Sequence, residues 1–411
     1  MVISELWSDD LRERLRERAC AAGFAAAGVA RVTLPDDPRT AEESERFEQW
    51  IDAGRAGEMG YLQRRDDAGA LIRGALHRAI PWARSVIVCA WNYNVSGPRS
   101  MDEASAGSAW IARYAWMGKS RVGQPPGPAD YHEELMVRLR QVEAWLMDET
   151  QCLTRCYVDT GPILERDFAA KAGIGWIGKN TCVLSQELGS WLLLGVIVTS
   201  LPLQNEVAGL VAADRCGSCT RCIDACPTGA LLSGPEPGGP REMDASRCIS
   251  YLTIEKKGPI DESLRQGIGR NVFGCDICQE VCPWNRKAPI AAADRNESRA
   301  ELVNPQLDWL AQMDSVEFRR ELRGSPLERT GWKRLRRNLA IAMGNEPDRA
   351  MAASYLERLD TWAMLPGDGI HDAALRDAAD WARRRIRERI EAAGSKGASA
   401  SLVGNVDRQS H

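Results

Sequence analysis

Apolar and polar positions alternate with different periods in different parts of the chain. Two apolar runs, Ser85–Ala90 and Trp191–Val198, are bounded by turn or polar residues, as buried strands are. Between these runs, apolar residues recur at the i, i+4, i+7 and i+11 spacing of an amphipathic helix, namely Leu135, Leu139, Val142 and Leu146. This mixture of patterns predicts an N-terminal α/β domain over residues 1–205, within a chain of the α+β class.

The pattern changes to a helical one from about residue 300. Segments 335–343 and 373–390 alternate apolar and basic residues, and Gly344-Asn345 is typical of a helix stop. We predict an α-helical domain over 296–393, whose antiparallel helix pairs would be degenerate solenoid units of the HEAT type. The composition after Ala393 is that of a linker, which predicts a disordered tail over 394–411.

Composition narrows the class of protein. The chain has 411 residues, 44% of them hydrophobic and 27% charged, as in ordinary soluble proteins, and its net charge of −4 excludes a general polyanion binder. We see no secretory leader after Met1 and no run of the ~18 apolar residues that a membrane span needs. We therefore expect a cytoplasmic monomer without a membrane contact. Its 13 cysteines are an odd number, which excludes a fully paired disulfide scaffold.

Eight of these cysteines form a pattern that is typical of iron–sulfur proteins. The first block has C-x2-C-x2-C-x3-C-P spacing, the second follows after one isolated cysteine, and eight thiolates serve two [4Fe-4S] clusters. We predict a bacterial ferredoxin-like domain over 206–295, in which the fourth cysteine of the run binds the other cluster. The predicted ligand sets are Cys216, Cys219, Cys222 and Cys282 for one cluster, and Cys226, Cys248, Cys275 and Cys278 for the other.

Two zinc sites are the alternative for the same cysteines, because paired C-x-x-C motifs also bind zinc. The strict x2-x2-x3 spacing followed by proline favours clusters. The remaining cysteines are scattered, and we interpret them as small buried apolar residues: Cys20, Cys89, Cys152, Cys156 and Cys182.

Positive charge is concentrated in residues 319–337. Only Glu321 and Glu328 oppose the basic residues there, so the local balance is +6. Such a face can follow a phosphate backbone, although a solvated helix face with internal ion pairs explains it equally well. The basic residues are Arg319, Arg320, Arg323, Arg329, Lys333, Arg334, Arg336 and Arg337.

Residues 157–181 form a second unusual segment. A short strand ends in Asp159, Thr160-Gly-Pro turns the chain, and three glycines then crowd one loop, where backbone could approach a large ligand. The loop has neither P-loop spacing nor a G-x-G-x-x-G after a strand, so a nucleotide site is unsupported. Taken alone, Asp159 is as well explained as a residue that caps the turn.

The motifs together resemble the epoxyqueuosine reductase family over roughly residues 10–390. One departure is a Gly/Pro-rich insertion, Met117–Ala129, where the family joins the flanking motifs almost directly. The motifs that carry the resemblance are Met59–Arg64, Arg113–Trp116, Asp130–His132, Val158–Arg166, Gly175–Asn180, Cys216–Leu231, Arg247–Glu255, Gly274–Asn285 and Gly331–Ala340.

The resemblance implies an oxidoreductase that reduces epoxyqueuosine to queuosine at the wobble position of tRNA, the last step of queuosine synthesis. It implies cobalamin, two [4Fe-4S] clusters and an unidentified low-potential electron donor. Asp159 is the matching proton donor, and an apolar corrin beside it would raise its pKa and keep it protonated. Asp130-Tyr-His132 is followed by Glu-Glu-Leu, so it lacks the usual histidine-ligand signature of cobalamin proteins, Asp-x-His-x-x-Gly. We expect His132 to be a core or surface histidine rather than a second acid.

The resemblance also suggests which residues contact the large ligands. The corrin candidates are Arg64, Lys179, Asn180, Asp276 and Ile277. The tRNA candidates are Lys333, Arg334, Arg336 and Arg337.

Three other functions fit parts of the sequence. A reductive dehalogenase would share cobalamin and clusters, but would usually carry a twin-arginine leader, which Met1–Arg14 lacks. An electron-transfer protein would need the clusters alone. A tRNA-binding module without catalysis would need only the basic segment.

Overall fold

An antiparallel sheet forms the centre of the N-terminal region. The computed structural model describes residues 6–121, 124–204, 212–232, 241–291 and 297–403. The sheet order is β1 (Ala26–Arg31), β2 (Ser85–Asn92), β9 (Leu192–Thr199) and β6 (Thr154–Tyr157), and each neighbouring pair is antiparallel. The two apolar runs are therefore strands, as predicted. The α/β description needs correction, because apolar runs alone do not fix strand direction and no pair in this sheet is parallel.

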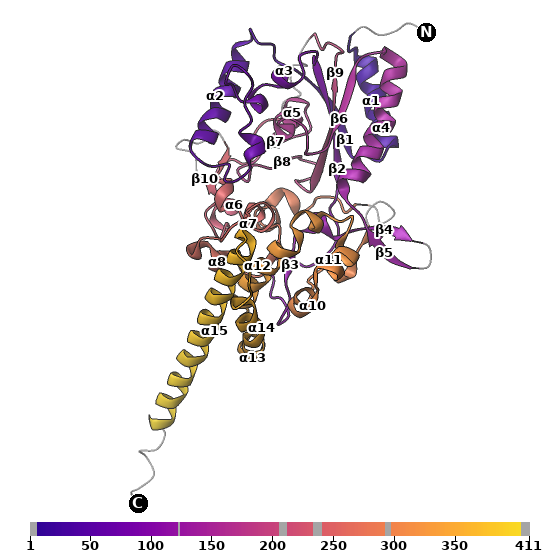
Figure 1. Cartoon of the computed structure of the whole chain (residues 1–411). Helices are drawn as coiled ribbons and strands as arrows, with labels where there is room; N and C mark the ends of the chain where they lie inside the picture. Colours follow the sequence, from indigo (N-terminus) through magenta and orange to yellow (C-terminus); the bar gives the residue numbers. More distant parts are fainter. Residues whose placement is uncertain (1–5, 122–123, 205–211, 233–240, 292–296, 404–411) are drawn as a thin grey trace, which may run out of the picture.

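Helices cover both faces of this sheet (Figure 1). Side chains of β2 alternate between two cores: Ile87 and Cys89 pack with α1 (Asp9–Ala21) and α4 (Tyr131–Thr150), whereas Val86 and Val88 face α3 (Leu76–Ala79) and α5 (Glu165–Lys171). α2 (Pro38–Asp52) lies farther out on the side of α3 and α5. The predicted apolar stripe of α4 is buried against the sheet.

The cysteine segment consists of short elements below the sheet. They are α6 (Arg221–Asp224), β10 (Leu231–Leu232), β11 (Glu242–Met243), α7 (Ile249–Ile254), α8 (Glu262–Ile268), β12 (Asn271–Phe273) and α9 (Ile277–Glu280). α6 contacts α9, which brings the two cysteine blocks together. β12 pairs in parallel with β3 (Trp110–Ile111), so a segment of the N-terminal region crosses into this part of the molecule.

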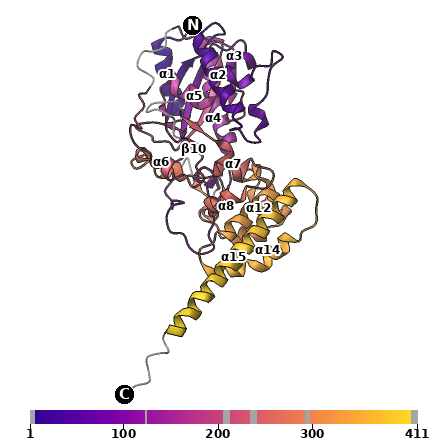
Figure 2. The same cartoon turned by 90° about the vertical axis from the view of Figure 1, so that its left-hand side faces the viewer.

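The C-terminal region is helical, as the periodicity predicts. Its helices are α10 (Leu307–Gln312), α11 (Ser315–Leu322), α12 (Gly331–Gly344), α13 (Arg349–Ser354), α14 (Leu356–Ala363) and α15 (Ile370–Val403). α12 ends at Gly344 with Asn345 as its cap, where the helix stop was predicted. α15 runs on to Val403 and projects from the molecule (Figures 1 and 2).

The extension of α15 differs from the disordered tail expected over 394–411. A helix already formed adds one hydrogen bond per residue without a new nucleation cost, so a linker-like composition need not end it. Residues 404–411 lie outside the described part of the chain.

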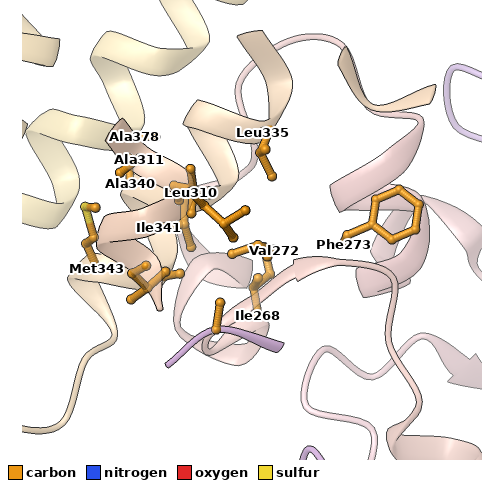
Figure 3. Packing of buried hydrophobic residues seen from close by; sticks show 14 of the residues in the cluster. Ile268, Val272, Phe273, Leu310, Ala311, Leu335, Ala340, Ile341, Met343 and Ala378 are labelled. Atoms are coloured by element: carbon orange, nitrogen blue, oxygen red, sulfur yellow. The ribbon is translucent and has the colours of Figure 1, made fainter. Parts of the chain in front are cut away.

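One hydrophobic core joins the cysteine segment to the helical region. Figure 3 shows Val272 and Ile268 beside Leu310 of α10 and Ile341 of α12. Ile111 and Trp116 of the N-terminal region belong to the same core. The four predicted domain ranges stay a prediction as units of folding, because this core crosses two of their boundaries.

The insertion after Trp116 forms a hairpin at the edge of the molecule (Figure 1). β4 (Met117–Arg121) and β5 (Gln124–Pro128) pair, and β13 (Glu297–Ser298) extends them to a three-stranded sheet. A further two-stranded ladder, β7 (Trp176–Ile177) with β8 (Val183–Leu184), carries the glycine loop. Among the described residues, none of the helices has the length and apolar character of a membrane span.

Candidate functional site

Asp159 occupies a strained position held by two hydrogen bonds. Its φ of 55° lies in the left-handed region that disfavours residues other than glycine. The Tyr131 hydroxyl donates to Asp159 Oδ2, and a ring nitrogen of His132, Nε2, lies 3.1 Å from the same oxygen. Asp159 follows the sheet strand β6, and Tyr131 and His132 begin α4, which packs on the same sheet. The sheet therefore positions Asp159 and its two partners relative to one another. Strain held in this way is common at functional sites.

Two opposing effects act on the pKa of Asp159. Burial raises its pKa, but the hydrogen bonds from His132 and Tyr131 and the positive charges of His132 and Arg329 lower it further, so that the net pKa is below its usual value. The expectation of a protonated Asp159 concerns the protein with a corrin beside it and stays a prediction. Desolvation was predicted correctly, but the donors that outweigh it come from α4 and from residue 329, which the local sequence does not reveal.

His132 contacts Asp159, whereas its interpretation as a core or surface histidine rather than a second acid stays a prediction. The ring also packs edge-on against Tyr131, with centroids 4.6 Å apart. An imidazolium beside a carboxylate can hold one proton between them and release it.

Arg329 reaches the site from the helical region. It ends the 3-10 helix η7 (Pro326–Arg329), and its Nη1 donates to the Tyr131 hydroxyl oxygen at 3.1 Å. Its Nη2 donates to both carboxylate oxygens of Asp130, at 2.7 and 2.8 Å. The sequence places Arg329 only within the basic segment, so its link to residue 159 could not be foreseen.

Glu165 is a second acid near Asp159. Burial, together with the negative charge of Asp159, raises the pKa of Glu165 to about 7. Its Oε1 is buried and has no hydrogen-bond partner among the described residues. The sequence reasoning treated Glu165 only as part of a motif. A buried acceptor left in this state favours a bound group that donates hydrogen bonds to it.

The structure brings each predicted cysteine set together. In the first set, burial and then the charges of Cys282 and Cys216 raise the pKa of Cys222 to about 11. In the second set, burial and then the charges of Cys248 and Cys226 raise the pKa of Cys275 well above its usual value. Among the eight cysteines, the charges that raise the pKa of each of these two thiols come from its own predicted set. Their assignment as ligands stays a prediction.

The described cysteines are not arranged around a position that a single metal ion could occupy. Nowhere in the described ranges do three His, Cys, Asp or Glu side chains converge on a position for one metal ion.

The five remaining cysteines are not all buried packing residues. Cys89 and Cys156 are buried in the sheet, as expected, but Cys20 is exposed and Cys152 is half-buried. Cys182 forms a hydrogen bond with the Cys278 thiol, which lowers the pKa of Cys182. Cys182 is therefore not a simple packing residue, because it lies next to the predicted ligand Cys278. The spacing of the cysteines does not reveal this contact.

Three of the five corrin candidates lie around Cys278. Asn180 is buried, and its side-chain nitrogen donates to the Cys278 carbonyl at 3.4 Å. Asp276 and Ile277 are the buried neighbours of Cys278 in the chain, and Asp276 Oδ2 accepts from the Arg113 backbone N–H at 2.6 Å.

The other two candidates lie elsewhere. Lys179 Nζ donates to the Gly217 carbonyl at 2.7 Å, on the loop of the first cysteine set, so its charge faces a different place. Arg64 has an exposed side chain on the segment after the 3-10 helix η1 (Gly60–Leu62).

The glycines of the loop have an internal explanation. A Cβ on Gly175 would lie 2.1 Å from the Leu184 carbonyl oxygen, and one on Gly178 would lie 2.4 Å from the Leu184 side chain. Close packing in the β7–β8 ladder therefore requires them, and they are no argument for a nearby ligand.

The basic segment is largely used inside the protein. Arg337 is 1% exposed, and its guanidinium donates to the carbonyls of Leu252, Lys256 and Gly258. Its prediction as a tRNA contact is wrong, because charge counting does not show which helix face is buried. Arg334 similarly donates to the Ile254 carbonyl.

The other two tRNA candidates are more accessible. The Arg336 guanidinium lies over the rings of Trp332 and Trp362, at 4.4 and 5.0 Å. Lys333 has a half-exposed side chain that pairs with Asp372 at 3.0 Å. Of the four candidates, Lys333 is therefore the best placed for a phosphate contact.

Comparison with known proteins points to one family. Residues 73–160 match a family model described as epoxyqueuosine reductase QueG, DUF1730, and residues 215–285 match a 4Fe-4S double cluster binding domain. The chain is 35% identical over 369 residues to the epoxyqueuosine reductase of Shewanella oneidensis, which covers 88% of this chain and 86% of that protein. The match to the second model supports iron–sulfur clusters in this chain.

Solved structures agree with these matches. The epoxyqueuosine reductase of Bacillus subtilis superposes with a TM-score of 0.73 at 27% identity, covering 92% of this chain and 90% of that one. An epoxyqueuosine reductase solved with an epoxyqueuosine-modified stem loop of tyrosine tRNA gives 0.71 at 25% identity, covering 92% of this chain and 99% of that one.

Proposed function

Because this chain belongs to the epoxyqueuosine reductase family, we propose that it reduces epoxyqueuosine in tRNA to queuosine and that the Asp159–His132 pair supplies a proton to the departing oxygen. Loss of the epoxide oxygen as water leaves a carbon–carbon double bond and consumes two electrons and two protons. The observation that carries the assignment of the pair is the convergence of Tyr131 and His132 on one oxygen of Asp159.

Cobalamin is the cofactor that the family resemblance implies, and the site has features that suit it. The buried Glu165 Oε1 lacks a hydrogen-bond partner in the described part of the chain, and the amide groups around a corrin are donors. We propose that Glu165, Asn180, Asp276 and Ile277 hold the corrin. When bound, the group supplies a cobalt centre that takes up electrons singly and attacks carbon.

Proton delivery is the task of the protein's own side chains. Asp159 alone is a poor acid, because its pKa is lowered by the hydrogen bonds around it. A protonated His132 donates its Nε2–H to Asp159 Oδ2, so the pair carries one proton next to the substrate. Tyr131 holds the same oxygen and fixes its direction. An acid of this kind is typically worth 10²–10⁴-fold in rate.

Electrons enter, in this proposal, at the first cysteine set. Gly217 and Ser218, between its ligands, are exposed, whereas Ile277 beside the second set is buried. Cys216, Cys219, Cys222 and Cys282 would hold the outer cluster, on the side accessible to a low-potential carrier, and Cys226, Cys248, Cys275 and Cys278 would hold the inner one. Such clusters would supply one-electron transfer.

The tRNA substrate would contact the helical region. The relative solved with a tRNA stem loop supports tRNA as the partner. We propose phosphate contacts at Lys333 and at the exposed Arg319 and Arg323, which remain accessible after the buried arginines are set aside. We further propose that the enzyme works as a monomer in the cytoplasm.

Anaerobic turnover of epoxyqueuosine tRNA tests the proposed function. The iron–sulfur-loaded protein is assayed with a chemical reductant, with and without added cobalamin, and queuosine is measured in the digested tRNA. We expect queuosine only when cobalamin is present. Equal turnover without cobalamin would refute the cofactor assignment, and absence of queuosine under both conditions would refute the reaction.

A further inference from the structure

Arg329 makes a direct connection between the helical region and the acid of the site. Its guanidinium uses one nitrogen on the Tyr131 oxygen and the other on both oxygens of Asp130. The guanidinium carbon also lies 4.9 Å from the centroid of the Tyr131 ring. Because its two terminal nitrogens contact two different side chains, the guanidinium is fixed in direction as well as in distance. The arginine is therefore held in one orientation.

This orientation decides what the Tyr131 hydroxyl can do. A guanidinium only donates hydrogen bonds, so the Tyr131 oxygen must be the acceptor for Arg329. The single hydroxyl hydrogen then remains for Asp159 Oδ2, to which Tyr131 donates. Without Arg329, the hydroxyl could rotate away or accept from another group. The arginine thus sets the direction of a hydrogen bond that it does not itself make.

Asp130 completes the arrangement at the start of α4. Its side chain caps the helix by accepting from the His132 backbone N–H at 3.0 Å, and the same carboxylate receives Arg329. Tyr131 and His132 are the first two residues of the helix that Asp130 caps. One ion pair therefore anchors both side chains that hold Asp159.

The charge of Arg329 acts on Asp159 as well. It is one of the positive charges that lower the pKa of Asp159, after the hydrogen bonds of His132 and Tyr131. The other titratable or charged groups whose charges reach this site are Tyr61, Arg73, Tyr114, Asp130, Glu165, Arg166 and Asp276.

We propose that Arg329 is a positioning residue for the reaction, which orients the Tyr131 hydroxyl toward Asp159 and fixes the start of α4 through Asp130. The proposal rests on the proposed role of the Asp159–His132 pair. Removing the guanidinium contacts to Tyr131 and Asp130 should misplace the Asp159 carboxyl group. Proton delivery should then slow by about 10- to 100-fold, as it does for small displacements of reacting groups.

Two substitutions at Arg329 separate orientation from charge. Arg329→Lys keeps the positive charge but loses the pair of guanidinium nitrogens that contact Tyr131 and Asp130. Arg329→Gln loses both the charge and these contacts. We expect single-turnover reduction of epoxyqueuosine in a tRNA stem loop to slow in both variants of the cofactor-loaded protein. Only Arg329→Gln should also move the alkaline limb of the pH–rate profile to higher pH, because loss of a nearby positive charge makes the proton carried by the Asp159–His132 pair harder to remove.

Asp130→Asn provides a second route to the same arrangement. Asparagine caps helices as well as aspartate does, so α4 is retained while the charged acceptor for Arg329 is lost. We expect slowing similar to that of Arg329→Lys. Arg387→Gln is the matched control, because Arg387 also contacts both oxygens of one carboxylate, that of Asp360, on the surface of the helical region. It should leave the rate unchanged.

Binding of the stem loop distinguishes this role from a phosphate contact. We expect the Kd of the tRNA stem loop and its salt dependence to be unchanged in Arg329→Gln. Weaker binding with an unchanged single-turnover rate would overturn the proposal, and so would wild-type rate with an unmoved pH profile. Asp159→Asn is measured in parallel: if it too keeps the wild-type rate, the proposed function has failed rather than the role of Arg329.

Discussion

The cysteine segment and the Asp159 site perform neighbouring tasks but are built in different ways. All eight predicted ligands fall within residues 216–282, and α6 and α9 bring their two blocks together. The groups around Asp159 come from distant parts of the chain, with Tyr131 on α4, Glu165 on α5 and Arg329 in η7. The cluster ligands are therefore determined by spacing within one short segment of the sequence. The Asp159 site, in contrast, forms only when the sheet and the helical region have packed together.

This difference predicts how each region responds to substitution. A cluster ligand is one of four bonds to a cofactor, so its loss should be all or none. A side chain around Asp159 contributes to orientation and charge, so its loss should be graded and should depend on pH.

Cys226→Ala should abolish turnover. Cys226 is the fourth cysteine of the first block and is predicted to bind the inner cluster. Its loss should therefore remove that cluster and lower the iron content from about eight to about four per chain. Iron analysis and anaerobic turnover are the measurements. Cys89→Ala, at a fully buried thiol in the sheet, is the control that should keep the iron. Full iron content in Cys226→Ala would contradict the ligand assignment.

His132→Gln should slow the reaction by about 10- to 100-fold without loss of iron. Glutamine can still donate a hydrogen bond to Asp159, but it cannot carry the proton of an imidazolium. The measurement is single-turnover reduction across the pH range in which histidine titrates. His371→Gln, whose ring contacts the Lys257 carbonyl instead, should behave as wild type. A wild-type rate for His132→Gln would assign the proton to another group.

Arg337→Met should destabilise the fold by about 3 kcal/mol. The substitution leaves buried carbonyls of the α7 region without the charged donor they share, and such bonds contribute about 1.5–3 kcal/mol each. Chemical denaturation measures the loss. Lys333→Gln, at an exposed ion pair, should change the free energy of unfolding by less than about 1 kcal/mol and weaken tRNA binding instead. The opposite ranking would contradict the division of the basic segment into buried and exposed arginines and lysines.

Glu165→Gln should change the pH dependence of stability. The folded-state pKa of about 7 lies above the usual value of 4.5, so the contribution of Glu165 to stability is present at low pH and is lost as pH rises to about 7. The variant should therefore gain about 2–3 kcal/mol over wild type between pH 5 and pH 8. Denaturation midpoints of the protein without cobalamin are the measurement. A difference that does not vary with pH would show that Glu165 does not titrate in this range.

The sequence predicted well what depends on near neighbours in the chain. The strands, the α4 stripe and the end of α12 follow from short periodic patterns, and the cysteine sets follow from spacing. Arg337 and Arg334 were misjudged because a run of charges does not show which face of α12 is buried. Asp159 was identified only through a family motif, and the groups that lower its pKa could not be foreseen because Tyr131, His132 and Arg329 approach it from remote segments.

The central claim is that Asp159, held by Tyr131 and His132, delivers the proton that lets the epoxide oxygen depart. The most direct test is the single-turnover rate of Asp159→Asn in the cobalamin- and cluster-loaded protein, with tRNA binding and iron content measured on the same sample. The account predicts a rate lower by about 10²–10⁴-fold, with unchanged binding and iron. A wild-type rate in that variant would contradict it.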